Sequence, residues 1–350
     1  MKFQVACPCC TSRRSFLRGV SAFAATAVAP VAKADAGTRV DVHHHIFPRP
    51  ILNLQEKLNP AWGRLGPPRS LKEWSPAIMI EAMDRDGVAA SITSSPGEAA
   101  WFGNVEAARR IMRAWNEYAA DLVRDHRSRF GFFAIVAPPD VDGSLAEITY
   151  ALDVLHADGI GFHSNYDGKH LGDGAFTPIF DELNRRKAVA YVHPARAPCC
   201  TNLQPGIRTN LLEFPFDTTR TIVSLLYSGT LARCPDLRFI FSHGGGAMPM
   251  LAGRIDLLSA EYKGLREKVP AGIPAELQRL YTDIAGTTSA ASIRATMSVT
   301  SPSHLLYGTD FPYLSIAEAN RGLAFVDVPD QVKRGIEREN ALALFPRFST

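Results

Sequence analysis

The 350-residue chain is poor in cysteine, in long apolar runs and in net charge of one sign. Three of its six cysteines lie within the first ten residues. The other three, Cys199, Cys200 and Cys234, cannot make a complete disulfide framework, so a buried core must hold the fold together. The apolar run from Gly19 to Ala32 is shorter than the roughly 20 residues of a spanning helix, which argues against a stable membrane anchor.

Residues 1–36 have the features of an export signal. Ser12-Arg-Arg-Ser-Phe-Leu17 matches the twin-arginine pattern, and Ala34-Asp-Ala36 fits a small-residue cleavage site after the apolar run. We therefore expect a twin-arginine (Tat) signal peptide over residues 1–36 and a single periplasmic domain over residues 37–350. The domain would stay in the cytoplasm if the leader does not function.

Removing this leader makes the charge balance nearly neutral. The whole chain has 38 basic and 35 acidic residues, of which the leader holds five and one. The remaining 33 basic and 34 acidic residues give a formal net charge of −1. The slight basicity of the whole chain comes from the leader, so it gives no indication of a nucleic-acid or membrane partner.

Short apolar, β-branched segments recur along residues 37–350 with helical patterns between them. Their spacing suits parallel strands joined by helices, and a (β/α)₈ TIM barrel needs around 250 residues. A doubly wound open sheet is the alternative, but no glycine-rich dinucleotide fingerprint follows the first strand. The expected strands are Arg39–His45, Val88–Ser95, Phe130–Ala137, Gly159–Asn165, Ala188–His193, Arg238–His243, Leu280–Ala285 and His304–Thr309.

Helix boundary signals lie between these strands. Ser75-Pro76 predicts a helix start and Gly87 its end. Ser144-Leu-Ala-Glu147 reads as a capping box, and Thr177-Pro178 predicts another helix start. The insertion from Phe47 to Trp74 is expected to cover the top of the barrel beside the first strand.

The segment Val40-Asp-Val-His-His-His-Ile-Phe-Pro48 is the most informative part of the chain. On a strand, alternation places Asp41, His43 and His45 on one face and His44 on the other. Two neutral imidazoles on one rigid face form half of a metal site. We therefore expect His43 and His45 to bind metal and His44 to be structural.

Polar residues of metal-ligand or acid–base type also end three later strands. His193 ends the fifth, His243 the sixth and Asp310 the eighth. In a (β/α)₈ barrel the carboxyl ends of the strands meet on one face, where the chemistry is carried out. A lone histidine there is commonly a structural cap, but the five groups together predict a catalytic metal site.

These motifs resemble the amidohydrolase superfamily. The resemblance rests on Asp-Val-His43-His-His45, Val-His193-Pro, Ser-His243-Gly-Gly-Gly and Gly-Thr-Asp310-Phe-Pro, in that order along the chain. The branch it resembles most contains aminocarboxymuconate-semialdehyde decarboxylase and the hydroxybenzoate decarboxylases. The stretch from Val192 to Cys200, with Glu213-Phe and Asp217-Thr-Thr-Arg220, is most similar to 6-methylsalicylate decarboxylases.

The resemblance implies one divalent metal held by four residues, His43, His45, His193 and Asp310. His243 would stand just outside as a base or electrostatic partner. Two-metal members usually carry a carboxylated lysine on strand four, and Gly159–Asn165 contains no lysine, which favours one metal. Imidazole and carboxylate ligands suit Zn²⁺, with Mn²⁺ as the alternative. His163 is a candidate extra ligand for which a structural role is favoured.

The implied activity is non-oxidative decarboxylation of a small hydroxylated aromatic acid such as 6-methylsalicylate, which yields CO₂ and a phenol. We expect Asp310 to protonate the ring carbon and His243 to maintain its protonation state. Arg220 is a candidate for binding the carboxylate, because its planar fork can hold two oxygens. An exposed helix position is the alternative for it. Further candidate substrate contacts are Asn165, Tyr166, Arg196 and Glu213.

Three alternatives use the same residues differently. The first is a metal-dependent hydrolase of a lactone or amide, and the second is a periplasmic binding protein without turnover. Simple metal capture does not require His243, which argues against the second. An α/β-hydrolase is excluded because the chain has no Gly-x-Ser-x-Gly elbow. Homo-oligomers are common among similar enzymes, so the resemblance leaves a homo-oligomer open, but no residue pattern locates an interface. Cys199-Cys200 is expected to pack in a loop.

Overall fold

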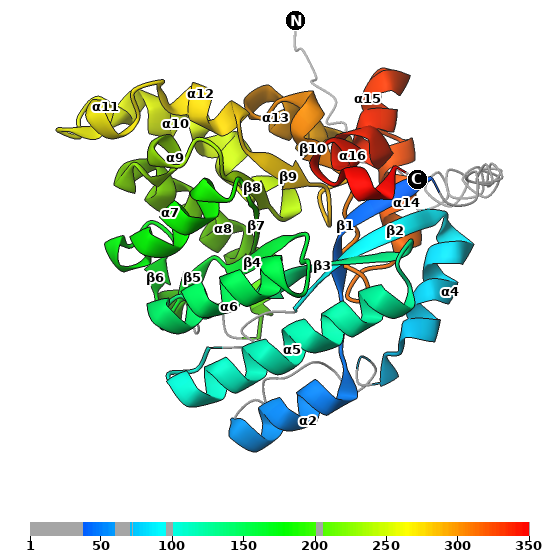
Figure 1. Cartoon of the computed structure of the whole chain (residues 1–350). Coiled ribbons are helices and arrows are strands. Elements are labelled where there is room, and N and C mark those ends of the chain that lie inside the picture. Colours follow the sequence, from blue (N-terminus) through cyan, green and yellow to red (C-terminus); the bar gives the residue numbers. More distant parts are fainter. Residues whose placement is uncertain (1–37, 60–70, 72, 96–100, 201–205, 350) are drawn as a thin grey trace, which may run out of the picture. The chain divides into compact units, whose positions relative to one another are not determined.

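The computed structural model describes residues 38–59, 71, 73–95, 101–200 and 206–349. The expected leader and part of the insertion from Phe47 to Trp74 lie outside these residues. Eight strands pair in parallel in the order β1-β2-β3-β4-β7-β8-β9-β10 (Figure 1). Their bounds are β1 Arg39–His45, β2 Val88–Ser94, β3 Phe130–Ile135, β4 Gly159–His163, β7 Val189–His193, β8 Arg238–Phe241, β9 Tyr281–Asp283 and β10 Leu305–Leu306.

Backbone hydrogen bonds link the first strand to the last and close the sheet into a ring. The N–H of Val42 donates to the carbonyl of Tyr307 over 3.0 Å, and the N–H of Asp310 donates to the carbonyl of His43 over 2.9 Å. The expected (β/α)₈ TIM barrel is therefore confirmed. The second bond also brings the segment that carries Asp310 directly beside β1.

Helices connect the successive strands and lie along the outside of the ring (Figure 1). A cluster of buried apolar side chains fills the space between the strands and these helices. The helices of four or more residues are α2 Arg49–Leu58, α4 Pro76–Asp86, α5 Val105–Asp125, α6 Val141–Asp153, α7 Thr177–Arg185, α8 Thr209–Ser228, α9 Thr230–Arg233, α10 Met248–Ser259, α11 Leu265–Lys268, α12 Ile273–Gln278, α13 Ala290–Val299, α14 Ile316–Ala324, α15 Asp330–Arg334, the π-helical turn Gly335–Glu339 and α16 Asn340–Leu344.

A second buried cluster fills the interior of the ring. It includes Val40 of β1, Phe133 of β3 and Tyr191 of β7, which come from different sides of the barrel. Leu344 and Phe348, near the C-terminus, pack into the same cluster. The interior is thus a packed core, as the barrel fold requires, and the chemistry is left to the open end of the strands.

Two of the three predicted helix starts are confirmed and one is wrong. The Ser75 side chain caps α4, which ends at Gly87 in the left-handed conformation, and α7 begins at Thr177 with proline in its first turn. Ser144 lies inside α6, whose cap is Asp140. Asp140 accepts from the N–H of Gly143 over 3.2 Å, so the carboxylate starts the helix one turn earlier than the predicted capping box.

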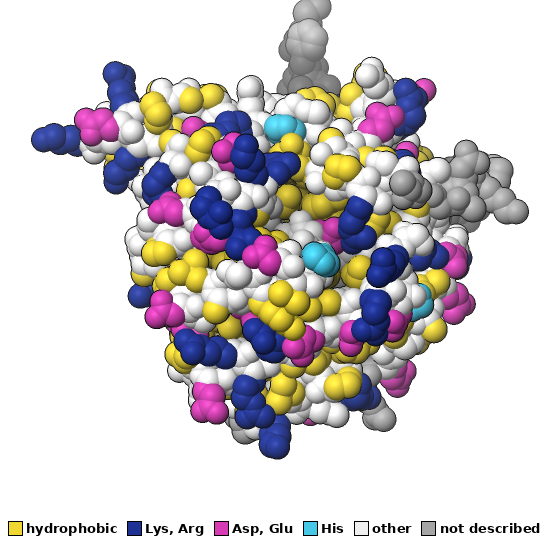
Figure 2. Space-filling view, in the orientation of Figure 1, with side chains coloured by type: hydrophobic (Ala, Val, Ile, Leu, Met, Phe, Trp, Pro, Cys, Tyr) yellow, Lys and Arg dark blue, Asp and Glu magenta, His cyan; other side chains and the backbone are white. Residues whose placement is uncertain are grey.

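A short antiparallel hairpin after β4 was not predicted. It consists of β5 Asn165–Tyr166 and β6 Lys169–His170, and it lies at the carboxyl end of the barrel strands. Basic and acidic side chains are interspersed over the face shown in Figure 2, in keeping with the near-neutral charge balance. In the described part of the chain, no helix is long and apolar enough to cross a membrane.

Candidate metal centre and active site

Four side chains converge at the carboxyl end of the ring. One ligand atom from each of His43, His45, His193 and Asp310 lies within 4.8 Å of the others. The Nε2 atoms of His43 and His45 are 3.1 Å apart, and Asp310 Oδ1 lies 3.3 Å and 3.0 Å from them. The four residues predicted as ligands are therefore brought together. His44 and Asp41 do not belong to this group.

The second nitrogen of each imidazole is held by the protein. His43 Nδ1 donates to Asp283 Oδ2 over 2.9 Å, and His193 Nδ1 donates to the carbonyl of Pro194 over 2.9 Å. His45 Nδ1 lies 3.1 Å from Ser94 Oγ. Because Nδ1 carries a proton where it donates, Nε2 is the nitrogen of His43 and of His193 that is left to bind a metal. This outer-shell support is typical of metal-binding histidines.

Burial and charge decide the protonation states here. Burial lowers the pKa of His45, and burial together with His45 and His43 lowers the pKa of His193 well below its usual value. Burial also lowers the pKa of His43, but the carboxylates of Asp283 and Asp310 outweigh it and raise that pKa to about 10. His45 and His193 are therefore neutral, whereas His43 carries one positive charge that the two carboxylates stabilise. A cation bound at its Nε2 would supply that charge instead.

These features fit a divalent cation. Burial raises the pKa of Asp310, but the charge of His43 and hydrogen bonds from its neighbours hold it well below the usual range, so Asp310 is an anion. Its Oδ1 is buried and makes no well-directed hydrogen bond with any described residue. Converging imidazole nitrogens and a buried carboxylate oxygen are a ligand set that suits a divalent metal.

His243 stands beside this group, as expected. Its Nε2 is 3.4 Å from Asp310 Oδ2, the oxygen turned away from His43 and His45. Both His243 and Asp310 have left-handed backbones, with φ of 56° and 62°. Non-glycine residues adopt this region at a cost, and such strain is concentrated at functional sites.

Two buried carboxylates to which the sequence analysis assigned no role, Asp283 and Asp41, position the centre. Asp283, at the end of β9, accepts from His43 Nδ1 through Oδ2 and from the backbone N–H of His243 through Oδ1. Asp41 accepts from the N–H and hydroxyl of Thr309, which precedes Asp310, and from His44 Nδ1 over 2.7 Å. His44 is therefore structural, as predicted, and Asp41 fixes the loop of Asp310.

The tight approach of these segments depends on glycine. A Cβ built on Gly308 would lie 2.8 Å from Asp283 Cβ and 2.9 Å from His43 Cβ. A Cβ on Gly246, whose φ is 69°, would lie 2.1 Å from the carbonyl oxygen of Pro215. Larger residues at either position would push β10 or α8 away from the centre.

A third buried carboxylate without an assigned role, Asp217 of α8, organises the side of the site. It is fully buried and accepts from Ser164 Oγ, from Asn165 Nδ2 over 2.7 Å and from His170 Nε2 over 3.0 Å. Burial raises its pKa, but these three hydrogen bonds lower it overall. Ser164 Oγ also accepts from the N–H of Ala195, so Asp217 ties α8 to β4, to the hairpin and to the loop after His193.

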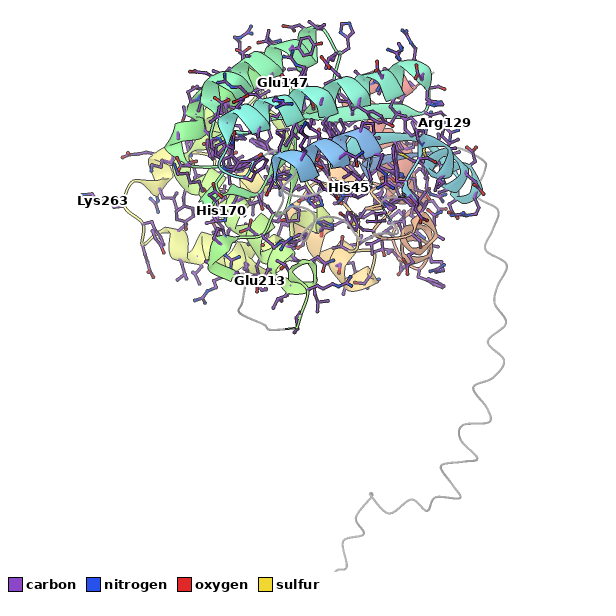
Figure 3. The ribbon with its side chains drawn as sticks, turned by 90° about the horizontal axis from the view of Figure 1, so that it is seen from below. His45, Arg129, Glu147, His170, Glu213 and Lys263 are labelled. Atoms are coloured by element: carbon purple, nitrogen blue, oxygen red, sulfur yellow. The ribbon has the colours of Figure 1, made fainter. Side chains whose placement is uncertain are left out.

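The predicted substrate contacts lie around this network. Asn165 is engaged with Asp217, and the Tyr166 hydroxyl accepts from the backbone N–H of His163 over 3.0 Å. His163 and Tyr166 line a narrow cavity with His193, and His163 is not a member of the metal group. Arg196 is half-buried in the loop after β7. Figure 3 shows where His170 and Glu213 lie in the fold relative to His45.

Arg220 lies one turn beyond Asp217 on α8. Its Nη1 is 3.8 Å from Asp217 Oδ1 and 4.0 Å from Glu213 Oε2. That nitrogen is buried and has no hydrogen-bond partner among the described residues, although the side chain is 39% exposed. Arg220 thus retains donors for a further anion, and its contact with substrate stays a prediction.

Comparison with known proteins places this geometry in a family. A family model described as Amidohydrolase matches residues 40–347. Decarboxylase yanB of Aspergillus niger is 32% identical over 330 residues, covering 89% of this chain and 88% of that protein. The 6-methylsalicylic acid decarboxylase acuB of Aspergillus aculeatus is 32% identical over 331 residues, covering 89% and 96%.

A solved structure shares the fold. The 5-carboxyvanillate decarboxylase of Novosphingobium aromaticivorans, complexed with manganese and 4-hydroxy-3-methoxy-5-nitrobenzoic acid, aligns with a TM-score of 0.79 at 21% identity, covering 89% of this chain and 96% of that one. The family match spans nearly the whole described domain, and its relatives carry the names of decarboxylases. The chain therefore belongs to the amidohydrolase family, and to the part of it that consists of decarboxylases.

Proposed function

We propose that this carboxy-lyase removes the carboxylate of a 2-hydroxybenzoate such as 6-methylsalicylate, without oxidation, at a single divalent metal. The observation that carries the proposal is the convergence of His43, His45, His193 and Asp310, with His243 against the second oxygen of Asp310. The relative named as a 6-methylsalicylic acid decarboxylase supports the choice of substrate. We propose Zn²⁺ as the native metal, with Mn²⁺ as the alternative, since manganese is present in the related solved structure.

The metal would act as a Lewis acid and template for the adjacent phenolate and carboxylate oxygens of the substrate. Residues of the chain would deliver the proton to the ring carbon. Asp310 rests ionised, so its Oδ2 must take up a proton during turnover before passing it to the ring carbon. His243 Nε2, 3.4 Å away, is the group placed to exchange that proton.

Arg220 is proposed to hold the departing carboxylate until the ring carbon is protonated. Its partners Asp217 and Glu213 lie 3.8 Å and 4.0 Å from Nη1, too far for strong hydrogen bonds, so its donors can turn to a substrate oxygen. Asp217 keeps the helix of Arg220 fixed relative to Ser164 and Asn165. Arg196, Asn165 and Tyr166 are proposed to line the substrate position as well.

A product assay separates this function from its rival. The metal-loaded protein would be offered a panel of hydroxybenzoates and of lactones. Formation of 3-methylphenol and CO₂ from 6-methylsalicylate is expected. If the hydroxybenzoates are not converted and the ring of a lactone is opened, the protein is instead a metal-dependent hydrolase.

We also propose that the twin-arginine leader exports the folded enzyme to the periplasm. The support is the motif itself, Ser12-Arg-Arg-Ser-Phe-Leu17, with its apolar run and cleavage site. Export after folding would allow the metal to be loaded in the cytoplasm.

A further inference from the structure

Two adjacent thiols face each other in the loop that leaves the metal centre. The short 3₁₀ turn Pro198–Cys200 follows β7, and the N–H of Cys200 donates to the carbonyl of Ala197 over 3.0 Å. The Sγ atoms of Cys199 and Cys200 are 2.8 Å apart. Cys199 is exposed and Cys200 is buried. The turn therefore presents one accessible thiol with a second thiol in direct contact behind it.

The surroundings of Cys199 and Cys200 give the two thiols different reactivity. The hydrogen bond with Cys199, together with burial, raises the pKa of Cys200 to about 11, although the nearby positive charge of Arg220 opposes this. Cys200 therefore stays a protonated thiol at neutral pH. An incoming reagent meets Cys199 first, because this residue is the exposed one.

We propose that Cys199 and Cys200 form a thiol-oxidation site that takes a small-molecule disulfide as its oxidant and closes into a vicinal disulfide. The Cys199 thiolate attacks one sulfur of the oxidant, which forms a mixed disulfide and releases one thiol. Cys200 then gives its proton to solvent, and its sulfur attacks Cys199 Sγ and releases the second thiol. The dithiol loses two electrons and two protons, and the oxidant is reduced to two thiols. The proposal does not depend on the decarboxylase function.

The product is expected to be easily reduced. Consecutive Cα atoms are about 3.8 Å apart, whereas bridged cysteines usually have Cα atoms about 4.4–6.8 Å apart. The ring therefore closes under strain, and strained, exposed disulfides are the labile kind. Formation should need an excess of oxidant, and a modest concentration of reduced glutathione should reverse it.

Cys234 provides an internal control. It precedes β8 at the amino end of the strands, opposite to the turn Pro198–Cys200, and is 1% exposed. Its Sγ lies 3.6 Å from the carbonyl oxygen of Phe180, and no second thiol of the described residues is beside it. It should neither react with the oxidant nor join the pair.

Peptide mapping of the full chain tests the site directly. Trypsin cuts after Arg196 and Arg208, and the fragment 197–208 contains Cys199 and Cys200 and no other cysteine. The folded, metal-loaded protein would be treated with oxidised glutathione, quenched with acid, alkylated and digested. The fragment should lose the mass of two hydrogen atoms, carry no glutathione and resist alkylation until it is reduced.

Two variants sharpen the result. Cys200→Ser should trap glutathione on Cys199, and Cys234→Ser should behave as the parent does. Any of three outcomes would overturn the proposal: glutathione retained on Cys199 of the parent chain, a disulfide between two chains, or an unchanged fragment. Failure of Cys200→Ser to gain glutathione would likewise show that Cys199 is not the entry point.

Discussion

Asp283→Asn is expected to weaken metal binding without unfolding the barrel. Asp283 Oδ2 accepts from His43 Nδ1, and Oδ1 accepts from the backbone N–H groups of His243 and Ala285. Every one of these partners is a donor. An asparagine has one acceptor and one donor end, so its amide must place an N–H against a donor on one side or the other.

Each orientation of the amide harms the centre. If its nitrogen faces His43, that imidazole must accept at Nδ1 and carry its proton on Nε2, where the metal should bind. If its oxygen faces His43, the N–H groups of His243 and Ala285 lose their acceptor. Changes in this outer shell typically cost about 10- to 100-fold in metal affinity. At about 1.4 kcal/mol for each factor of ten, the expected loss is about 1.4–2.8 kcal/mol of binding free energy.

The assay is competition between the protein and a chromophoric chelator, with Zn²⁺ and Mn²⁺ in turn. Tyr191→Phe is the matched control, since its hydroxyl reaches Asp283 Oδ2 only over 3.5 Å and its ring stacks on Phe133 at 4.8 Å. The control should bind metal nearly as the parent does. A folded Asp283→Asn protein with the parent's metal affinity would refute the role given to Asp283.

Three further predictions concern proton transfer and export. Asp310→Asn keeps one ligating oxygen but removes the proton carrier. Metal content should therefore fall only partly, whereas the decarboxylation rate should drop by about 10²–10⁴-fold. A rate near that of the parent with metal bound would mean that the proton comes from another group. His243→Asn should retain its metal, measured by elemental analysis, and still lose rate in steady-state kinetics, whereas loss of the metal would make His243 a ligand. Replacing Arg13 and Arg14 with Lys should leave the enzyme in the cytoplasm on cell fractionation, and unchanged periplasmic recovery would mean that another route reads the leader.

The strands and the convergent ligands could be predicted because both follow from local rules. Parallel strands buried on both faces read as continuous apolar runs, and the ring geometry places their carboxyl ends together. His45 and His193 end β1 and β7, and Asp310 follows β10, so their meeting needed no knowledge of side-chain packing.

The supporting carboxylates could not be predicted in the same way. Asp217 lies within a long helix, where an acidic residue usually faces solvent, and only the packing of the hairpin against α8 buries it. Asp283 lies inside the predicted strand Leu280–Ala285, whereas β9 ends at Asp283, and its role depends on a contact with His43 of β1. The misplaced start of α6 has a similar cause, because Asp140 competes with Ser144 as the cap.

The central claim is that one metal at this centre drives loss of CO₂ from a hydroxybenzoate. The most direct test is to titrate metal-free protein with Zn²⁺ or Mn²⁺ and follow labelled CO₂ released from carboxyl-labelled 6-methylsalicylate. Release should rise with added metal and level off at one equivalent per chain, and His43→Ala should abolish it. Release that is independent of metal, or that needs two equivalents, would contradict the single-metal decarboxylase.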